Sequence, residues 1–218
     1  MLDPYRAADR EMSGLTKDID SMFNSTAQSL PMDELNYTKA KNLSSNLYER
    51  LLERVNRVYL RIAKNAIADV KMILKEEGYN EDDVGLVPIE LRDGLMSGYN
   101  ELTGYRFDKE YERKKDRTTE TLIAYLGIQE RRRALKRARD LVARQIKQYG
   151  DLLIDDTYYE AYEQAGVSKV MWVTEKDEKV CSICRERDGK VYPLSDVPGK
   201  PHLNCRCHIR PVKRSVMK

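Results

Sequence analysis

Residues 172–212 read WVTEKDEKVCSICRERDGKVYPLSDVPGKPHLNCRCHIRPV, and this stretch contains all four cysteines and both histidines of the chain. Cys181 and Cys184 have the C-x-x-C spacing with which a tight turn presents two thiolates to one metal ion. Cys205 follows after 20 intervening residues, inside a second donor-rich segment, HLNCRCH. Because Zn²⁺ takes four sulfur or nitrogen ligands in structural sites, this concentration of donors predicts one structural zinc site.

The spacing leaves the second pair of ligands open. It is either His202 with Cys205 or Cys207, or Cys205 with Cys207, whose side chains would point to the same side of an extended strand. His208 is a further candidate outside this group. The candidate ligands are therefore Cys181, Cys184, His202, Cys205 and Cys207.

Three other uses of the cysteines are disfavoured. Disulfides do not fit the reducing cytoplasm in which we expect the chain to be made. A redox C-x-x-C is expected to open a helix after a strand, whereas this pair lies between a strand-like run and a polar turn. A catalytic zinc site is disfavoured because the chain has no H-E-x-x-H motif and the surplus of donors leaves no reason for an open position.

The flanks of the cysteines predict a small β unit. The β-branched and apolar run 170–174 indicates a strand. Asp188-Gly189 is a hairpin-turn dipeptide, so residues 190–192 are expected to form the return strand. Residues 207–212 are expected to form a last short strand. At about 45 residues the unit is too small to fold on its own core, and we expect metal binding to stabilise it.

The order W-x-T-x-x-D-x-x-V-C-x-x-C, D-G-x-x-Y, P-H-x-N-C-R-C and P-V resembles the Mu F-type minor head proteins of tailed bacteriophages, also called phage head morphogenesis proteins. The family usually has proline at the position of Leu203. The resemblance extends more weakly through 120–166, and residues 1–110 match nothing in it. The matching residues are Trp172, Thr174, Asp177, Cys181, Cys184, Gly189, Pro201, His202, Asn204, Cys205, Arg206, Cys207 and Pro211.

The resemblance implies a structural virion protein that sits inside the capsid at the portal vertex. Its implied roles are head morphogenesis and the handling or ejection of packaged DNA. Its implied partners are the portal protein, packaged double-stranded DNA and other head proteins. We expect it to be made in the host bacterial cytoplasm and to be present in several copies per virion. We expect no enzyme activity, since both histidines lie in the metal segment and no catalytic motif is visible.

Two long helices are predicted before this segment. Met12, Leu15, Ile19 and Met22 form a narrow apolar stripe in a helix over 3–30, which we expect to dock on another subunit or the portal. A second helix over 33–77, capped by Asp33 and ended by Gly78, is either a stave of a helical bundle or a coiled-coil arm. A short helix is expected over 88–98. No apolar run is long enough for a transmembrane helix.

Residues 127–150 predict a basic amphipathic helix, and 151–165 a further helix whose tyrosines pack on the zinc unit. The chain's net charge is only +3, so this local charge is a distinct feature. It is either a solvated face or a surface for DNA phosphates. The candidate nucleic-acid contacts are Arg131, Arg132, Arg133, Lys136, Arg137 and Arg139.

The predicted architecture is mainly α, with long amphipathic helices followed by a small C-terminal zinc-stapled α+β module. The expected domains are a helical region, 1–165, and the module, 166–218. Within the helical region, 1–110 is unmatched and 110–165 holds the helices of the family. The expected function is that of a structural minor head protein. The alternative is a zinc-containing DNA-binding regulator, which would need helix-turn-helix geometry before the basic helix.

Overall fold

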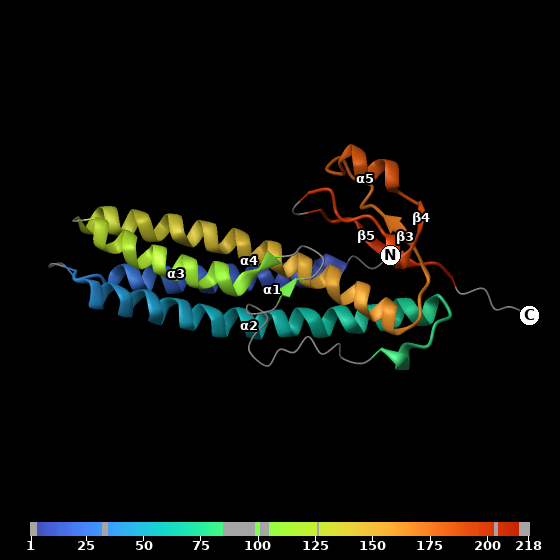
Figure 1. Ribbon diagram of the computed structural model, residues 1–218, viewed down its shortest axis with the longest axis horizontal. Helices are drawn as coiled ribbons and strands as arrows, with labels where there is room; N and C mark the ends of the chain where they lie inside the picture. The colour runs from blue at the N-terminus through green and yellow to red at the C-terminus, as the bar shows by residue number, and fades with distance from the viewer. Residues whose placement is uncertain are drawn as a thin grey trace, which may run out of the picture. The chain divides into compact units, whose positions relative to one another are not determined.

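The computed structural model describes residues 4–31, 35–84, 99–100, 105–125, 127–202 and 205–213. These residues are mainly helical and carry a small three-stranded sheet near the C-terminus, which confirms the predicted fold class (Figure 1). The helices are α1 (Pro4–Gln28), α2 (Tyr37–Glu76), α3 (Phe107–Ala124), α4 (Ile128–Gln164) and α5 (Ser182–Arg187), with short turns η1 (Glu81–Asp83) and η3 (Leu194–Asp196). The strands are β1 (Tyr99–Asn100), β2 (Tyr105–Arg106), β3 (Lys169–Val173), β4 (Val191–Pro193) and β5 (His208–Pro211).

The chain divides into two compact units. Unit 1 comprises Met1–Asp9, Arg61–Ile89 and Gly150–Lys218, and therefore contains the sheet and all four cysteines. Unit 2 comprises Arg10–Leu60 and Glu90–Tyr149, and its core is built from segments of α1, α2, α3 and α4. Within the described ranges, no helix is long and apolar enough to cross a membrane.

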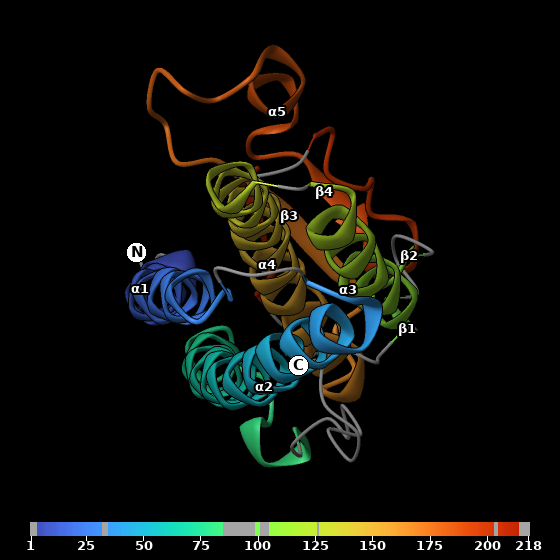
Figure 2. The same cartoon turned by 90° about the vertical axis from the view of Figure 1, so that its left-hand side faces the viewer.

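Helix α1 lies beside α2 (Figure 2), and its apolar stripe is buried within unit 2. Leu15 is 0% exposed and Ile19 is 1% exposed, and the ring of Phe23 meets that of Tyr48 edge-on with their centroids 6.4 Å apart. The prediction that this stripe docks on another subunit is therefore wrong for these side chains. The stripe packs within the chain because Phe23 widens it and adds a large apolar surface, which favours packing on the chain's own α2.

Two glycines end long helices where the backbone needs a positive φ. Gly78, with φ 78°, follows α2, and Gly166, with φ 67°, follows α4. At the first, the amide of Gly78 donates to the carbonyl of Lys75 and that of Tyr79 to Leu74, which is the Schellman pattern. The predicted role of Gly78 is thereby confirmed. The expected cap Asp33 and the expected helix over 88–98 lie outside the described residues.

Helix α4 is continuous, so the prediction of separate helices over 127–150 and 151–165 is wrong. Gly150 lies buried inside it and does not end it. Glycine inside a helix costs about 1 kcal/mol relative to alanine, which tertiary packing on both sides can offset. Ile146 and Ile154, at 0% and 1% exposure, carry the buried stripe past the glycine.

The C-terminal sheet has the strand order β4-β3-β5, and both neighbours run antiparallel to β3. The expected strands are confirmed, since Val170 of β3 lies opposite Tyr192 of β4 and Pro211 of β5. The expected hairpin turn is wrong, because Asp188 and Gly189 follow helix α5 and do not directly join two strands. Gly189 has φ 74°, so the dipeptide supplies the positive φ that ends this short helix.

Candidate metal centre

The four cysteines come from two segments of unit 1. Cys181 is the N-cap residue of α5, and Cys184 lies in the first turn of that helix. Cys205 and Cys207 precede β5. The C-x-x-C spacing suits this turn, because the sulfur of Cys181 accepts a hydrogen bond from the backbone amide of Cys184 at 3.4 Å.

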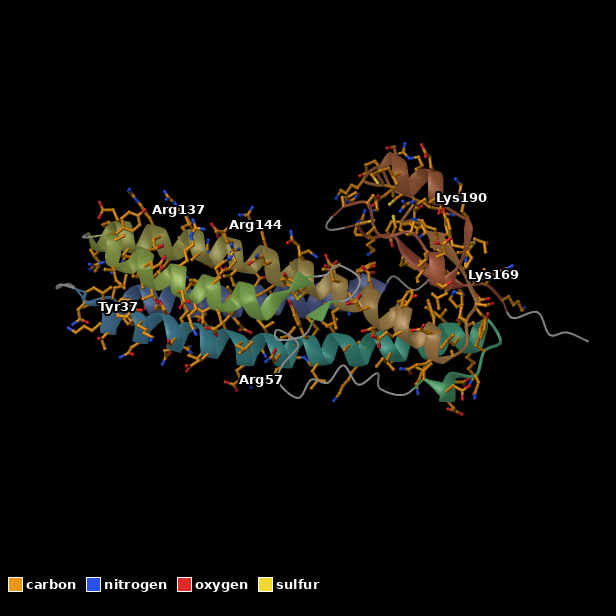
Figure 3. The ribbon with its side chains drawn as sticks, viewed as in Figure 1. Tyr37, Arg57, Arg137, Arg144, Lys169 and Lys190 are labelled. Atoms are coloured by element: carbon orange, nitrogen blue, oxygen red, sulfur yellow. The ribbon has the colours of Figure 1, made fainter. Side chains whose placement is uncertain are left out.

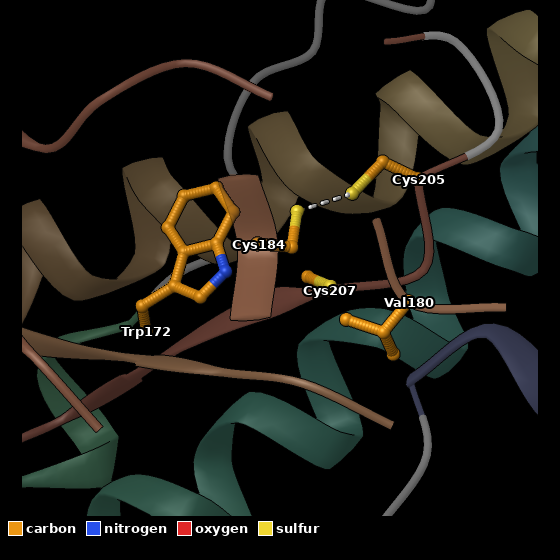
Figure 4. Packing of buried hydrophobic residues seen from close by; sticks show 5 residues of the cluster. All are labelled: Trp172, Val180, Cys184, Cys205 and Cys207. Carbon is orange, nitrogen blue, oxygen red and sulfur yellow. Dashed lines mark hydrogen bonds between the residues drawn. The ribbon is translucent and has the colours of Figure 1, made fainter. Parts of the chain in front are cut away.

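Three of the thiols form a compact buried cluster. The sulfur atoms of Cys184, Cys205 and Cys207 all lie within 4.8 Å of one another, and the three residues are 1%, 5% and 3% exposed. The sulfurs of Cys184 and Cys205 are 3.5 Å apart (Figure 4). Tetrahedral ligands at the zinc–sulfur distance would be separated by about 3.8 Å. The cluster could therefore hold a metal ion with little rearrangement.

The thiols differ in how readily they lose their protons. Burial raises the pKa of Cys184 well above its ordinary value, and the neighbouring Cys205, Cys207 and Cys181 raise it further. Burial also raises the pKa of Cys207 to about 11. By contrast, the backbone amide of Cys184 lowers the pKa of Cys181 to about 7. A bound cation would stabilise these buried thiols as thiolates, which explains why they lie so close together.

The two histidines occupy different surroundings. His202 is exposed, and it contributes to the lowered pKa of Cys181, so it lies near the edge of the cluster. His208 is buried on β5, opposite Val173, and its Nδ1 lies 3.9 Å from Oε1 of Glu175. The structure thus brings Cys184, Cys205 and Cys207 together, with Cys181 hydrogen-bonded beside them. It places His208 against a carboxylate.

The four cysteines are free thiols. The separation of 3.5 Å between the sulfurs of Cys184 and Cys205 is far longer than the disulfide bond length of about 2.05 Å. The prediction that this C-x-x-C pair lies outside the setting of a redox pair is nevertheless wrong. Cys181 does begin a short helix after a strand, which is the setting expected for a redox pair. The reason for preferring a metal is therefore the clustering of the other thiols around Cys184.

Several residues of the sequence motif support the cluster from outside. Trp172 is 2% exposed and belongs to the same apolar cluster as the three buried cysteines, and the guanidinium of Arg187 lies 5.1 Å from its ring centroid. Asp188 accepts a hydrogen bond from the amide of Thr174 at 3.0 Å. An ion pair joins Asp177 to Arg206, the residue between the last two cysteines. These contacts fix the segments that carry the thiols.

Helices of unit 1 also hold the module. Arg210 of β5 pairs with Glu76 at 2.9 Å and with Glu77 at 2.8 Å. The hydroxyl of Tyr162 donates to the carbonyl of Ile209 at 3.3 Å, and that of Tyr79 to Val212 at 3.0 Å. The expectation that a tyrosine of 151–165 packs on the module is thus confirmed. The contacts with Glu76, Glu77 and Tyr79 could not be read from the sequence, because they join positions more than 130 residues apart.

The basic residues of α4 do not all point to solvent, and Arg131 is buried. Arg131 is 4% exposed, and its Nε donates to the carbonyls of Leu122 at 3.0 Å and Tyr125 at 2.8 Å. It therefore satisfies the C-terminal end of α3, and its burial removes it from the side chains that could reach a phosphate. Sequence reasoning missed this role because a helix-capping arginine looks like any other member of a basic run.

The other candidates remain near the surface of unit 2. Arg132 and Lys136 are exposed and, with Arg139, line a hollow beside α1. Arg139 pairs with Asp20 at 3.4 Å and with Asp140 at 2.6 Å. Arg133 and Arg137 are exposed, as is Arg144 about two turns after Arg137, and Figure 3 shows Arg137 and Arg144 projecting from α4. The six predicted contacts therefore do not share one face.

The long helices and the C-terminal thiol cluster define a mainly helical protein with a small module able to hold a metal ion. The family model described as phage Mu protein F like protein matches residues 87–210, which include all four cysteines, and the chain belongs to this family. Membership indicates a phage head morphogenesis protein, a component of the virion that interacts with other head proteins. Comparisons with curated proteins and with solved structures each gave no match.

Proposed function

We propose that the chain is a minor head protein that sits at the portal vertex inside the capsid, where it acts in head morphogenesis and in the handling or ejection of packaged DNA. The observation that carries the proposal is the family match over residues 87–210, which spans the thiol cluster and its supporting contacts. The role is structural. Family membership supports the virion setting, and the portal and DNA as partners are our inference from it.

The thiol cluster is proposed to bind one structural Zn²⁺ through Cys181, Cys184, Cys205 and Cys207. The mutual approach of three buried sulfurs supports three of these ligands. Cys181 completes the set more readily than His202, because it already contacts Cys184 through the helix N-cap. The ion would bind the thiols as thiolates and join the α5 turn to the segment before β5.

The variant His202→Ala tests whether Cys181 or His202 is the fourth ligand beside Cys184, Cys205 and Cys207. Metal analysis of protein purified without added zinc should give about one equivalent in the wild type and in this variant. Loss of zinc in His202→Ala would instead assign the fourth position to the histidine. Ser195→Ala is a matched control, since Ser195 is an exposed residue between the two pairs of cysteines that carries no sulfur or imidazole donor.

DNA contact is proposed for the outward cations of α4, chiefly Arg133, Lys136 and Arg144. All three are exposed. Such contacts are made to phosphates and carry no sequence preference, so binding should weaken steeply with salt. Neutralising the three should lower affinity equally for unrelated duplexes. A strong preference for one short duplex would favour the alternative that the chain is a zinc-containing DNA-binding regulator.

The location is tested on virions of the phage whose genome encodes the chain. Mass spectrometry of purified virions should find the protein in several copies, and co-expression with the portal protein of the same genome should give a complex that survives purification. A regulator would be absent from virions. If the protein is present but separates from the portal, its place in the head lies elsewhere.

A further inference from the structure

The surface of unit 2 contains a groove between α3 and α4, which lie side by side in Figures 1 and 2. Its floor is apolar, with Tyr48, Leu122 and Leu135 only 1% to 2% exposed. Its volume is about 250 Å³. Pockets for small molecules usually have about 300–1,000 Å³, so this hollow suits the insertion of one or two side chains from a larger partner.

One side chain in the groove is exposed against the usual preference for burial. Leu141 lies in the middle of α4 and is 46% exposed, although its neighbour on the helix, Val142, is 4% exposed. Leu141 therefore lines the groove, but about half of its side chain stays in contact with water. A partner that covers Leu141 gains by removing apolar surface from water.

The rim of the groove carries positive charge. Lys114 and Arg117 on α3 and Arg137 on α4 line it, and no acidic residue is among its lining residues. Arg117 and Arg137 are exposed, and neither forms an ion pair within the described part of the chain. An apolar floor between two basic rims matches a helix with an apolar face flanked by carboxylates.

We propose that this groove binds an acidic amphipathic helix of a protein partner. DNA fits it less well, because a phosphate backbone would meet the basic rims but bury nothing against Leu141 and the floor. The binding mode is that of a helix laid in a groove, with apolar side chains inserted and acidic ones on Arg117 and Arg137. The proposal is separate from the proposed metal and DNA contacts and does not depend on them.

The test uses the full chain and fluorescein-labelled helical peptides. The first peptide has leucines on one face and glutamates on both flanks. The second replaces the glutamates by lysines, and the third replaces the leucines by alanines. Anisotropy should show that the first binds at least about tenfold more tightly than either of the others, and that its affinity falls as salt is raised.

Two variants assign the binding to the groove. Leu141→Ser should weaken the first peptide by about tenfold, and so should the double variant Arg117→Ser with Arg137→Ser at low salt. Arg50→Ser is the matched control, since Arg50 is an exposed arginine of α2 that does not line the groove, and it should leave the affinity unchanged. All of these positions are exposed, so circular dichroism should show unaltered folding.

Either of two results would overturn the proposal. The first is binding that does not depend on apolar contact, seen as equal affinity for the leucine and alanine peptides or as wild-type affinity in Leu141→Ser. The second is a labelled DNA duplex that binds more tightly than the acidic peptide and depends on Arg117 and Arg137 but not on Leu141. That second pattern would make the groove part of a nucleic-acid surface.

Discussion

Lys200 and Asp155 form an ion pair that ties the segment before Cys205 to helix α4. Their Nζ and Oδ2 atoms are 2.7 Å apart, and each side chain is 20% exposed. Lys200 also donates to the carbonyl of Cys205 at 2.8 Å, and Tyr5 at the start of α1 donates to the other oxygen of Asp155. The position of one thiol in the cluster therefore depends on a carboxylate 50 residues earlier in the chain.

Asp155→Asn should destabilise the protein by about 1–3 kcal/mol, because it leaves Lys200 partly buried without its anion. Urea unfolding should show a lower midpoint with an unchanged slope. Asp116→Asn, an exposed carboxylate on α3, is the control and should change stability little. A loss of equal size in both variants would show that the pair contributes nothing specific.

Asp156→Asn should stabilise the protein increasingly as pH rises from about 4 to 7. Burial raises the pKa of Asp156 to about 7, and Asp155 and Glu160 add to this rise while Lys200 opposes it. Because the folded pKa lies above the unfolded one, the folded wild type keeps its proton and loses stability as pH rises through that window. At about 1.4 kcal/mol per pKa unit, the gain reaches at most about 4 kcal/mol.

The check is the difference in unfolding free energy between Asp156→Asn and wild type, measured from about pH 5.5 to 8. The difference should grow with pH and level off above about 7. A difference that stays constant over this range would mean that the carboxyl is ionised in the folded protein throughout.

Cys184→Ser should abolish metal binding and open the C-terminal module. Trp172 is the sole tryptophan of the chain and is 2% exposed beside the cysteines, so its emission reports on the module. We expect zinc content near zero and a red-shifted emission, with most helical signal retained. Ser182→Ala changes an exposed position of the same turn and should leave both unchanged. Retention of zinc by Cys184→Ser would exclude this thiol as a ligand.

Arg131→Met should cost about 2–4 kcal/mol, since it leaves the carbonyls of Leu122 and Tyr125 without their buried donor. Arg133→Met on the exposed side of α4 is the comparison and should cost less than about 0.5 kcal/mol. Thermal unfolding of the two variants measures the contrast. Similar melting temperatures would contradict the capping role.

Gly166→Ala should destabilise the protein by about 1 kcal/mol, because alanine is strained at φ 67°. Gly14→Ala is the opposite case. Gly14 lies inside α1 with nothing within 4 Å of an added Cβ, so alanine should stabilise by about 0.5–1 kcal/mol. Chemical unfolding of both variants should give changes of opposite sign, and a matching sign would contradict this account.

The sequence was sufficient to predict that the cysteines gather and that helices dominate, because both follow from local patterns. Donor spacing indicated the cluster, and three- and four-residue periodicity indicated α1, α2 and α4. Helix α5 was missed, since its six residues are too few to show any period. Gly150 was misread as a helix end because a glycine's cost can be offset by packing that only the structure reveals.

The choice of ligands and the supports of the cluster could not be predicted. Cys205 and Cys207 look equivalent to His202 in the sequence, and only their burial against Cys184 separates them. Tyr5 approaches Asp155 across 150 positions, a pairing that no local pattern encodes. The phage Mu F-like family was identified because its motif residues are concentrated in one short stretch.

The two halves of the thiol cluster are separated by 20 residues between Cys184 and Cys205. An ion held by both halves would close this segment into a loop, and the entropy of loop closure changes only with the logarithm of length, about 0.6 kcal/mol for each doubling. Insertions after Asp196, which ends η3, should therefore be tolerated. A single residue inserted between Cys205 and Cys207 would turn one thiol to the opposite side. We therefore expect the module to accept added residues between η3 and Lys200 but not between Cys205 and Cys207.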